Sequence, residues 1–390
     1  KDAKSAIPEL IQAMKDKEEK VQNTARAALE NIGEDVAHNL LKEIEKESNP
    51  DFLVHSLKIL AKLQKKTDEI NQLLLNLGTH QNIKVKLCAY DTLGKLKILE
   101  AIPLFIESIK EDNGKIKLAA IKNLGKLDHE IDEISLETII KLFNKSSIQL
   151  KKTIISTLAK VGQNNDKAIE TIINNIDNDD INLQLESIKA LNKLDKNFEK
   201  AVPLLVNIVK TDNIDKKLFF CALEALSHIG PKARKSIPVL LKLMYSNEIE
   251  KVNKVSKALG AIGVASCDGL LKISAGATAP QRSEIAKTFV IMGEKAIPYL
   301  IKAIKGKNPT TRKLASDVLG DMGEIALPYL YDLMKETDFW INQALNNSII
   351  KIGGPSVAFL VEIIKDEKRD EETRSKALGI LKKIKKSFNK

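Results

Sequence analysis

A thirty-residue repeat, present twice in succession, constrains the fold of this 390-residue chain more than any other feature. The first copy begins at Gly293 and opens with Glu-Lys-Ala-Ile-Pro-Tyr-Leu, and the second begins at Gly323 and opens with Glu-Ile-Ala-Leu-Pro-Tyr-Leu. Self-similarity at a period of about 20 to 50 residues indicates a repeat architecture, in which each repeat buries its apolar face only against its neighbours. We therefore expect a stack of equivalent hairpins rather than a set of globular domains.

The residue that closes the repeat can be followed along nearly the whole chain. It falls at twelve positions, 30 to 35 residues apart. These are Gly33, Gln64, Lys97, Asp128, Gly162, Asp195, Gly230, Gly263, Gly293, Gly323, Gly353 and Lys385. The residue four places earlier is always Leu, Ile or Phe, and the residue one place earlier is always Leu, Ile, Val or Met. Apolar residues three apart share one face of a helix, so each repeat is predicted to end in a helix with a buried stripe.

The repeat resembles the bacterial type of HEAT repeat, a helical hairpin whose first helix opens with Ala-Ile-Pro and whose second closes with Ala-Leu-Gly-x-Ile-Gly. The opening recurs at Ala6-Ile-Pro8 and Ala101-Ile-Pro103, where proline suits the first turn of a helix. The resemblance implies an all-α fold, a right-handed α-α superhelix of about twelve helical hairpins. We predict one such solenoid over residues 1–385, followed by a short basic tail at 386–390.

The cysteines and the apolar runs bear on the compartment. Cys88 and Cys221 occupy the same position in the third and seventh repeats, too far apart in a solenoid for a disulfide, and Cys267 is the third. Free thiols favour a reducing compartment such as the cytoplasm. A processed exported protein stays open, as do residues preceding Lys1, because the sequence begins without methionine. No apolar run reaches the roughly 18 residues of a membrane span.

Catalytic and metal-binding signals are missing from the sequence. No two of the five histidines have the i, i+4 spacing of a metal-binding helix face, and neither a P-loop nor a nucleophile elbow occurs. The HEAT-type hydroxylases use repeated His-Glu pairs, whereas this chain has one, His129-Glu130. We predict no catalytic residue, no metal and no cofactor. An enzyme like the HEAT-type phycobilin lyases is supported by no residue beyond the repeat itself.

Lysine accumulates on one face of the second helix, at the positions six and two residues before the closing residue. Twelve of these 24 positions are lysine. They are Lys58, Lys122, Lys189, Lys257 and Lys287 in the first column, and Lys62, Lys95, Lys126, Lys160, Lys193, Lys351 and Lys383 in the second. Second helices line the concave side of the solenoids that this chain resembles, so a lysine ladder is expected there. It is open to three interpretations: a solvated face, a groove for an acidic protein surface, or a track for a nucleic-acid backbone.

Aromatic residues gather late in the chain. Tyr299, Tyr329 and Phe359 lie thirty residues apart at one position of the first helix, so they should form a ladder across three repeats. Phe339 and Trp340 are expected in the turn between the two helices of the eleventh repeat. Packing alone can explain the ladder. Large aromatic residues in a solvent-exposed turn, as expected for Phe339 and Trp340, indicate a contact with a partner.

We therefore predict a non-enzymatic scaffold or assembly subunit of a larger protein complex that binds a protein partner through the solenoid surface, and a partner with an acidic surface is one of the alternatives. The alternative is a nucleic-acid-binding solenoid, although arginine, which phosphate recognition favours, is scarce at six residues. Which face binds and the oligomeric state stay open. The expected contact residues are Phe339, Trp340, Tyr299, Tyr329, Phe359, Lys58, Lys62, Lys122, Lys126, Lys189, Lys193 and Lys257.

Overall fold

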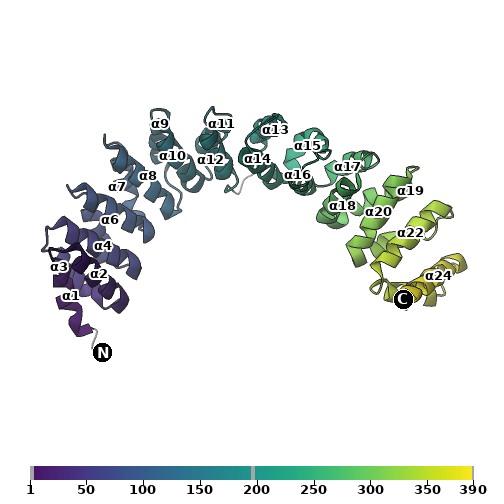
Figure 1. Cartoon of the computed structure of the whole chain (residues 1–390), viewed down its shortest axis with the longest axis horizontal. Coiled ribbons are helices and arrows are strands. Elements are labelled where there is room, and N and C mark those ends of the chain that lie inside the picture. Colours follow the sequence, from purple (N-terminus) through teal and green to yellow (C-terminus); the bar gives the residue numbers. More distant parts are fainter. Residues whose placement is uncertain (1–3, 195–197, 389–390) are drawn as a thin grey trace. The chain divides into compact units, whose positions relative to one another are not determined.

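The computed structural model describes residues 4–194 and 198–388, and every regular element within these ranges is a helix. The helices form twelve successive hairpins (Figure 1). They group into two compact halves, residues 1–195 and 196–390, with six hairpins each. The all-α solenoid expected from the sequence is confirmed. The continuity of one solenoid over residues 1–385 stays a prediction.

In the N-terminal half, the second helices lie along the inner side of the row of hairpins (Figure 1). The first helices are α1 (Ile7–Ala13), α3 (Val36–Ile44), α5 (Asp68–Leu77), α7 (Ile102–Ser108), α9 (Glu133–Asn144) and α11 (Asp166–Asn174). The second helices are α2 (Glu19–Ile32), α4 (Pro50–Leu63), α6 (Ile83–Lys95), α8 (Gly114–Leu127), α10 (Ile148–Val161) and α12 (Ile181–Leu191). The short 3-10 helices η1 (Lys4–Ala6) and η2 (Leu99–Ala101) precede α1 and α7.

The C-terminal half repeats the same arrangement. Its first helices are α13 (Val202–Lys210), α15 (Ile237–Leu243), α17 (Cys267–Ser274), α19 (Ile297–Lys305), α21 (Leu327–Leu333) and α23 (Ser356–Lys365). Its second helices are α14 (Lys216–Ile229), α16 (Ile249–Ile262), α18 (Ala279–Met292), α20 (Pro309–Met322), α22 (Phe339–Ile352) and α24 (Glu371–Phe388). The 3-10 helices η3 (Glu199–Ala201), η4 (Gly230–Ser236), η5 (Val264–Ser266), η6 (Gly293–Ala296) and η7 (Gly323–Ala326) lead into α13 to α21. Helix α24 continues to Phe388, so residues 386–388 of the predicted tail are helical.

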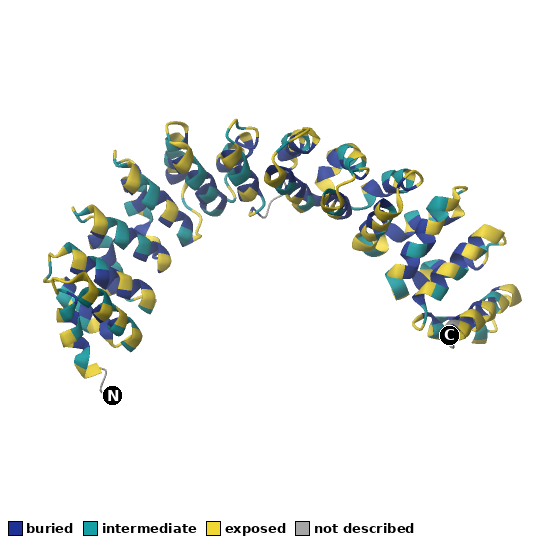
Figure 2. Ribbon diagram, in the orientation of Figure 1, coloured by how far each residue is buried: buried dark blue, intermediate teal, exposed yellow. Residues whose placement is uncertain are grey.

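The repeat that the sequence predicts is visible both in the backbone conformation of the closing residue and in the buried core. Every residue four places before the closing residue is buried, with at most 8% of its surface exposed. Eleven of the closing residues lie in the described ranges, and nine of these have a positive φ, including the non-glycine residues Gln64, Lys97 and Asp128. That left-handed conformation ends a helix and turns the chain toward the next hairpin. Buried residues accordingly run along the helices, and exposed residues lie both at the turns and on the helices (Figure 2).

Successive second helices approach closely at a position three residues before the closing residue. At Gly125 in α8, a side-chain Cβ would lie 2.8 Å from the Thr157 Oγ1 atom of α10. The Thr157 hydroxyl donates a hydrogen bond to the Ile121 carbonyl of α8, at 3.0 Å. At Gly260 in α16, a Cβ would lie 2.9 Å from the Ile291 Cγ2 atom of α18. The absence of a side chain at these glycines therefore sets the spacing between neighbouring hairpins.

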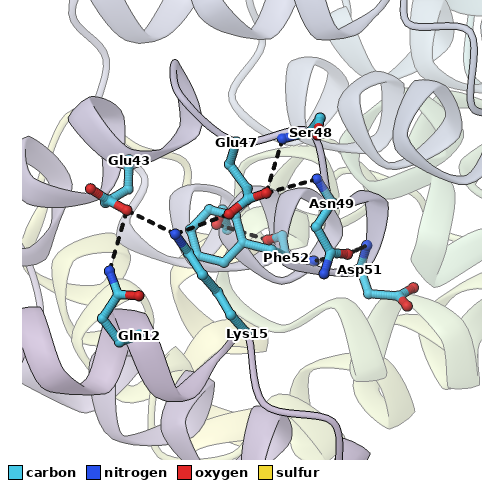
Figure 3. A network of polar contacts seen from close by, with 9 residues as sticks. Gln12, Lys15, Glu43, Glu47, Ser48, Asn49, Asp51 and Phe52 are labelled. Carbon is cyan, nitrogen blue, oxygen red and sulfur yellow. Dashed lines mark hydrogen bonds and ion pairs between the residues drawn. The ribbon is translucent and has the colours of Figure 1, made fainter.

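Charged contacts also join neighbouring hairpins, and Figure 3 shows the network between the first two. The Lys15 ammonium lies 2.9 Å from a carboxylate oxygen of Glu43 and 2.9 Å from one of Glu47, and it is 5.0 Å from the centre of the Phe52 ring. The hydrogen bond with Glu43 is the main cause of a raised pKa at Lys15, and the bonds from Lys15 lower the pKa of Glu43 and of Glu47. Glu47 also accepts hydrogen bonds from the backbone N–H groups of Ser48 and Asn49. This network therefore joins the first two hairpins.

Candidate protein-binding surfaces

Phe339 and Trp340 are the first two residues of α22, not residues of the preceding turn as expected from the sequence. The helix starts there because Asp338 is its N-cap, and the Asp338 Oδ1 atom accepts hydrogen bonds from the N–H groups of Trp340 and Ile341 at 2.8 and 3.0 Å. Phe339 is 69% exposed and Trp340 is 55% exposed. Their rings meet edge to face with centroids 5.1 Å apart. The two rings form an apolar projection from the edge of the eleventh hairpin.

The turn that precedes this aromatic pair is held by both neighbouring hairpins. Lys376 of α24 donates hydrogen bonds to the carbonyl oxygens of Met334 and Glu336, at 3.0 and 2.7 Å. On the other side, the Lys305 ammonium of α19 lies 2.6 Å from the Glu336 carboxylate. The Asn342 side chain, one turn into α22, also donates to the Glu336 carbonyl. These contacts hold the backbone that precedes the aromatic pair, so this backbone need not be ordered when a partner binds.

The three residues of the predicted aromatic ladder lie at the opposite edge of the hairpins from Phe339 and Trp340. Tyr299, Tyr329 and Phe359 are half-buried near the starts of α19, α21 and α23. The Tyr329 hydroxyl donates a hydrogen bond to the Glu294 carboxylate of the preceding hairpin at 2.8 Å, and this bond raises the pKa of Tyr329. Because Tyr329 is near the start of α21 and Phe339 follows the end of that helix, the ladder and the exposed pair do not form one patch.

The predicted lysine columns lie on the second helices except at Lys193, which follows the end of α12 at Leu191. In the N-terminal half, Lys58, Lys62, Lys122, Lys189 and Lys193 are exposed and Lys126 is half-buried. Two of these six form ion pairs with the preceding hairpin, Lys62 with Glu30 at 3.0 Å and Lys126 with Asp91 at 3.1 Å.

The other four of these six have no acidic group within 4.0 Å among the described residues. The same holds for the exposed Lys257 of α16 in the C-terminal half. The columns are thus partly neutralised within the chain and partly available to a partner.

Metal and membrane sites were also sought over residues 4–194 and 198–388. No three His, Cys, Asp or Glu side chains there are placed to hold a metal ion. None of the helices in these ranges is both long and apolar enough to cross a membrane. Cys88 and Cys221 are half-buried and Cys267 is buried, and none of the three forms a disulfide bond within the part of the chain that the structure describes.

One surface feature was missed in the sequence. A cavity of about 720 Å³ lies between the seventh and eighth hairpins, where Phe219 and Phe220 of α14 meet lysines from α13 to α16. The run Lys216-Lys-Leu-Phe-Phe220 was a visible signal, since it places two basic and two aromatic residues on the first turns of one helix.

Solved structures of importin beta and of the karyopherin Kap121p have the same architecture. A crystal structure of importin beta in an ammonium sulfate condition matches with a TM-score of 0.53 and 14% identity, over 98% of this chain and 64% of that one. The karyopherin Kap121p bound to the extreme C-terminus of the protein phosphatase Cdc14p matches with a TM-score of 0.53 and 11% identity, over 97% and 50%. Kap121p bound to Pho4p matches with a TM-score of 0.51 and 12% identity, over 97% and 50%.

Because the sequence identities are low, the similarity to these solved structures shows the fold alone. This chain is a HEAT-repeat α-solenoid, as the resemblance of its repeats implied. It spans between half and two thirds of the length of these solved chains. The sequence matches no family model and no curated protein.

Proposed function

We propose that this chain is a non-enzymatic scaffold that holds a protein partner, and that Phe339 and Trp340 anchor the contact. The observation that carries the proposal is the exposure of these two rings, 69% and 55%, on a base that hydrogen bonds hold in place. Tryptophan and tyrosine are common energetic centres of interfaces, and exposed aromatic pairs are rarely left facing water.

The free energy that the two rings contribute to binding can be estimated from the ring area that a partner would cover. Covering about 100 Å² of each exposed ring would contribute about 2.5 kcal/mol per ring, at about 25 cal/mol per Å². Together the two rings can supply much of the binding free energy of a micromolar complex, which is about 8 kcal/mol. Weaker polar contacts along the helices around the pair would supply the remainder.

The solved neighbours support binding of protein segments by this architecture. Two of them hold a protein partner, the extreme C-terminus of Cdc14p in one and Pho4p in the other, both on Kap121p. A scaffold role for this chain agrees with that use of the fold, but one fold serves many functions, so the exposed pair carries the proposal.

The experiment begins with purification of the native complex and identification of the protein that accompanies the tagged chain. The dissociation constant of that partner is then measured by calorimetry for the wild type, for Trp340→Ala and for Ile325→Ala. Ile325 is the matched control, because it is 47% exposed in the same hairpin but at the opposite edge. We expect Trp340→Ala to weaken binding about 30-fold or more, as a loss of about 2 kcal/mol implies. Equal affinities of Trp340→Ala and the wild type would contradict the proposal.

Nucleic-acid binding is the second candidate, favoured by the unpaired lysines of the N-terminal half. The test replaces Lys122, Lys126, Lys189 and Lys193 together by glutamate and titrates the wild type and the variant with a 20-nucleotide single strand and a 20-base-pair duplex at several salt concentrations. Phosphate contacts would give a slope of log affinity against log salt of about −0.7 to −0.9 per contact, and the variant would lose it. Absence of binding by the wild type at 150 mM salt would remove this candidate.

A further inference from the structure

The cavity between the seventh and eighth hairpins has an aromatic floor. Phe219 is only 5% exposed and Phe220 is half-buried, and their ring centroids lie 5.7 Å apart in an edge-to-face contact. The floor belongs to α14, and α15 and α16 of the next hairpin form the opposite wall. At about 720 Å³, the space lies within the range of about 300 to 1,000 Å³ typical of ligand sites, enough for a short peptide segment.

Ammonium groups stand over this aromatic floor. The Lys251 Nζ atom is 4.8 Å from the centre of the Phe219 ring, and the Lys216 Nζ atom is 5.5 Å from that of Phe220. Lys254 adds a third contact at 6.0 Å from Phe220. Cation–π attraction holds these side chains against the rings, so their positive charge is ordered around the cavity rather than spread through solvent.

The charges around the cavity are unbalanced. Four lysines line it, Lys210, Lys216, Lys242 and Lys251, against the carboxylates of Asp212 and Glu248. Lys216 is paired with Glu250 at 2.6 Å. The other three have no acidic group within 4.0 Å among the described residues. A cation would be repelled here, whereas a purely apolar ligand would remove water from ammonium groups without replacing it.

We propose that this cavity binds an acidic peptide segment of a partner protein, with one aromatic or aliphatic side chain set between its carboxylates. The apolar side chain packs against the half-buried Phe220, and the carboxylates pair with Lys210, Lys242 and Lys251. The cavity lies three hairpins before the one that carries Phe339 and Trp340, so this is a separate site and its test does not depend on theirs.

Two features favour a peptide over a nucleic acid. The cationic groups are all lysines, whereas bidentate recognition of phosphate favours arginine. Base stacking needs an open ring face, but Phe219 is almost completely buried and lysines occupy positions over both rings. The occupant of this cavity is therefore expected to carry carboxylates and one compact apolar group.

The probe for the test is a fluorescein-labelled peptide, Gly-Asp-Glu-Asp-Phe-Asp-Glu-Asp-Gly, whose binding to the full chain is followed by fluorescence anisotropy. Lys210→Glu combined with Lys242→Glu is the test variant, since both side chains are exposed and lie at the cavity wall. Lys272→Glu combined with Lys307→Glu is the matched control, which changes the net charge equally at exposed positions away from the cavity. We expect the test variant to weaken binding at least tenfold and the control less than threefold. Equal losses in both variants would overturn the proposal, because they would show unspecific attraction by net charge.

Further probes examine the apolar part and the class of ligand. A peptide with serine in place of phenylalanine should bind at least fivefold more weakly to the wild type, and Phe220→Ala should remove that difference. If the serine peptide binds as well as the original, the aromatic floor plays no part and the proposal is wrong. A twelve-nucleotide uridine RNA should neither bind comparably nor displace the peptide. Displacement by RNA that the test variant abolishes would instead assign the cavity to nucleic acid.

Discussion

Replacing Gly125 with alanine is expected to destabilise the N-terminal half by about 1 to 3 kcal/mol, although alanine is the better helix former. The new methyl group would stand 2.8 Å from the Thr157 Oγ1 atom and 3.4 Å from the Thr157 Cα atom. Thr157 is 3% exposed, and its hydroxyl donates to the Ile121 carbonyl at 3.0 Å. To avoid the methyl group, either the threonine side chain must rotate and lose that bond, or α10 must move away from α8.

The magnitude follows from three opposing contributions. Forcing a methyl group into a packed contact typically costs about 1 to 3 kcal/mol, and losing the hydrogen bond costs a further 0.5 to 1.5 kcal/mol or so. The higher helix propensity of alanine offsets about 1 kcal/mol of this. Gly114→Ala is a matched control, because Gly114 is the first residue of the same helix and has no atom within 4 Å of where its Cβ would lie. It should be neutral or slightly stabilising.

Urea denaturation followed by circular dichroism measures the difference, and hydrogen exchange locates it. Because each hairpin of a repeat protein contacts only its neighbours, the loss of protection should concentrate in α8 and α10. A Gly125→Ala protein as stable as the Gly114→Ala protein would refute the idea that glycine sets the spacing of the second helices.

Two further predictions concern titrating groups. Burial raises the pKa of Cys267 to about 12, so at pH 8 iodoacetamide should modify this thiol about a thousandfold more slowly in the native protein than in urea, as mass spectrometry of the digested protein would show; comparable rates in both states would contradict its burial. Hydrogen bonds from Ser135 to the N-cap residue Asp132 hold the pKa of that carboxyl below its usual value of about 3.8. Since a lowered folded-state pKa adds stability above the unfolded pKa, Asp132→Asn should be less stable than the wild type by about 0.5 kcal/mol at pH 7, and urea titrations should show this gap closing as the pH falls below about 3.8; a gap of constant size would contradict the charge effect.

The repeat made the fold readable from the sequence. A closing residue recurs every 30 to 35 positions, and apolar residues precede it at two fixed offsets. A stack of amphipathic hairpins buries these apolar residues in every repeat. The structure buries the residue four places before each closing residue accordingly. The i, i+4 spacing of the lysine columns fixes which residues share a face only where the helix continues, and α12 ends at Leu191, two residues before Lys193.

The arrangement of the surface residues was harder to read. Phe339 and Trp340 were expected in a turn, but Asp338 accepts hydrogen bonds from the N–H groups of Trp340 and Ile341, so α22 already begins at Phe339. That aspartate before an apolar run was a helix-start signal in the sequence. The neutralisation of Lys126 by Asp91 and the cavity at Phe219 depend on side chains some 30 residues apart that approach only after stacking, so no local pattern predicts them.

The aromatic pair and the lysine-lined cavity share an edge of the C-terminal half, because both lie where a first helix turns into a second helix. The stacking of hairpins at about 10 Å per step separates them by roughly 30 to 40 Å, which about ten to twelve extended residues can span. One partner segment with an acidic stretch at one end and an apolar stretch at the other could therefore occupy both sites, the cavity and the aromatic pair. Binding at the first site would raise the effective concentration at the second, so two individually weak contacts would together give a tight one. In such a scaffold the number of hairpins between the two sites sets the distance between them, and this distance determines how long a partner segment must be to reach both.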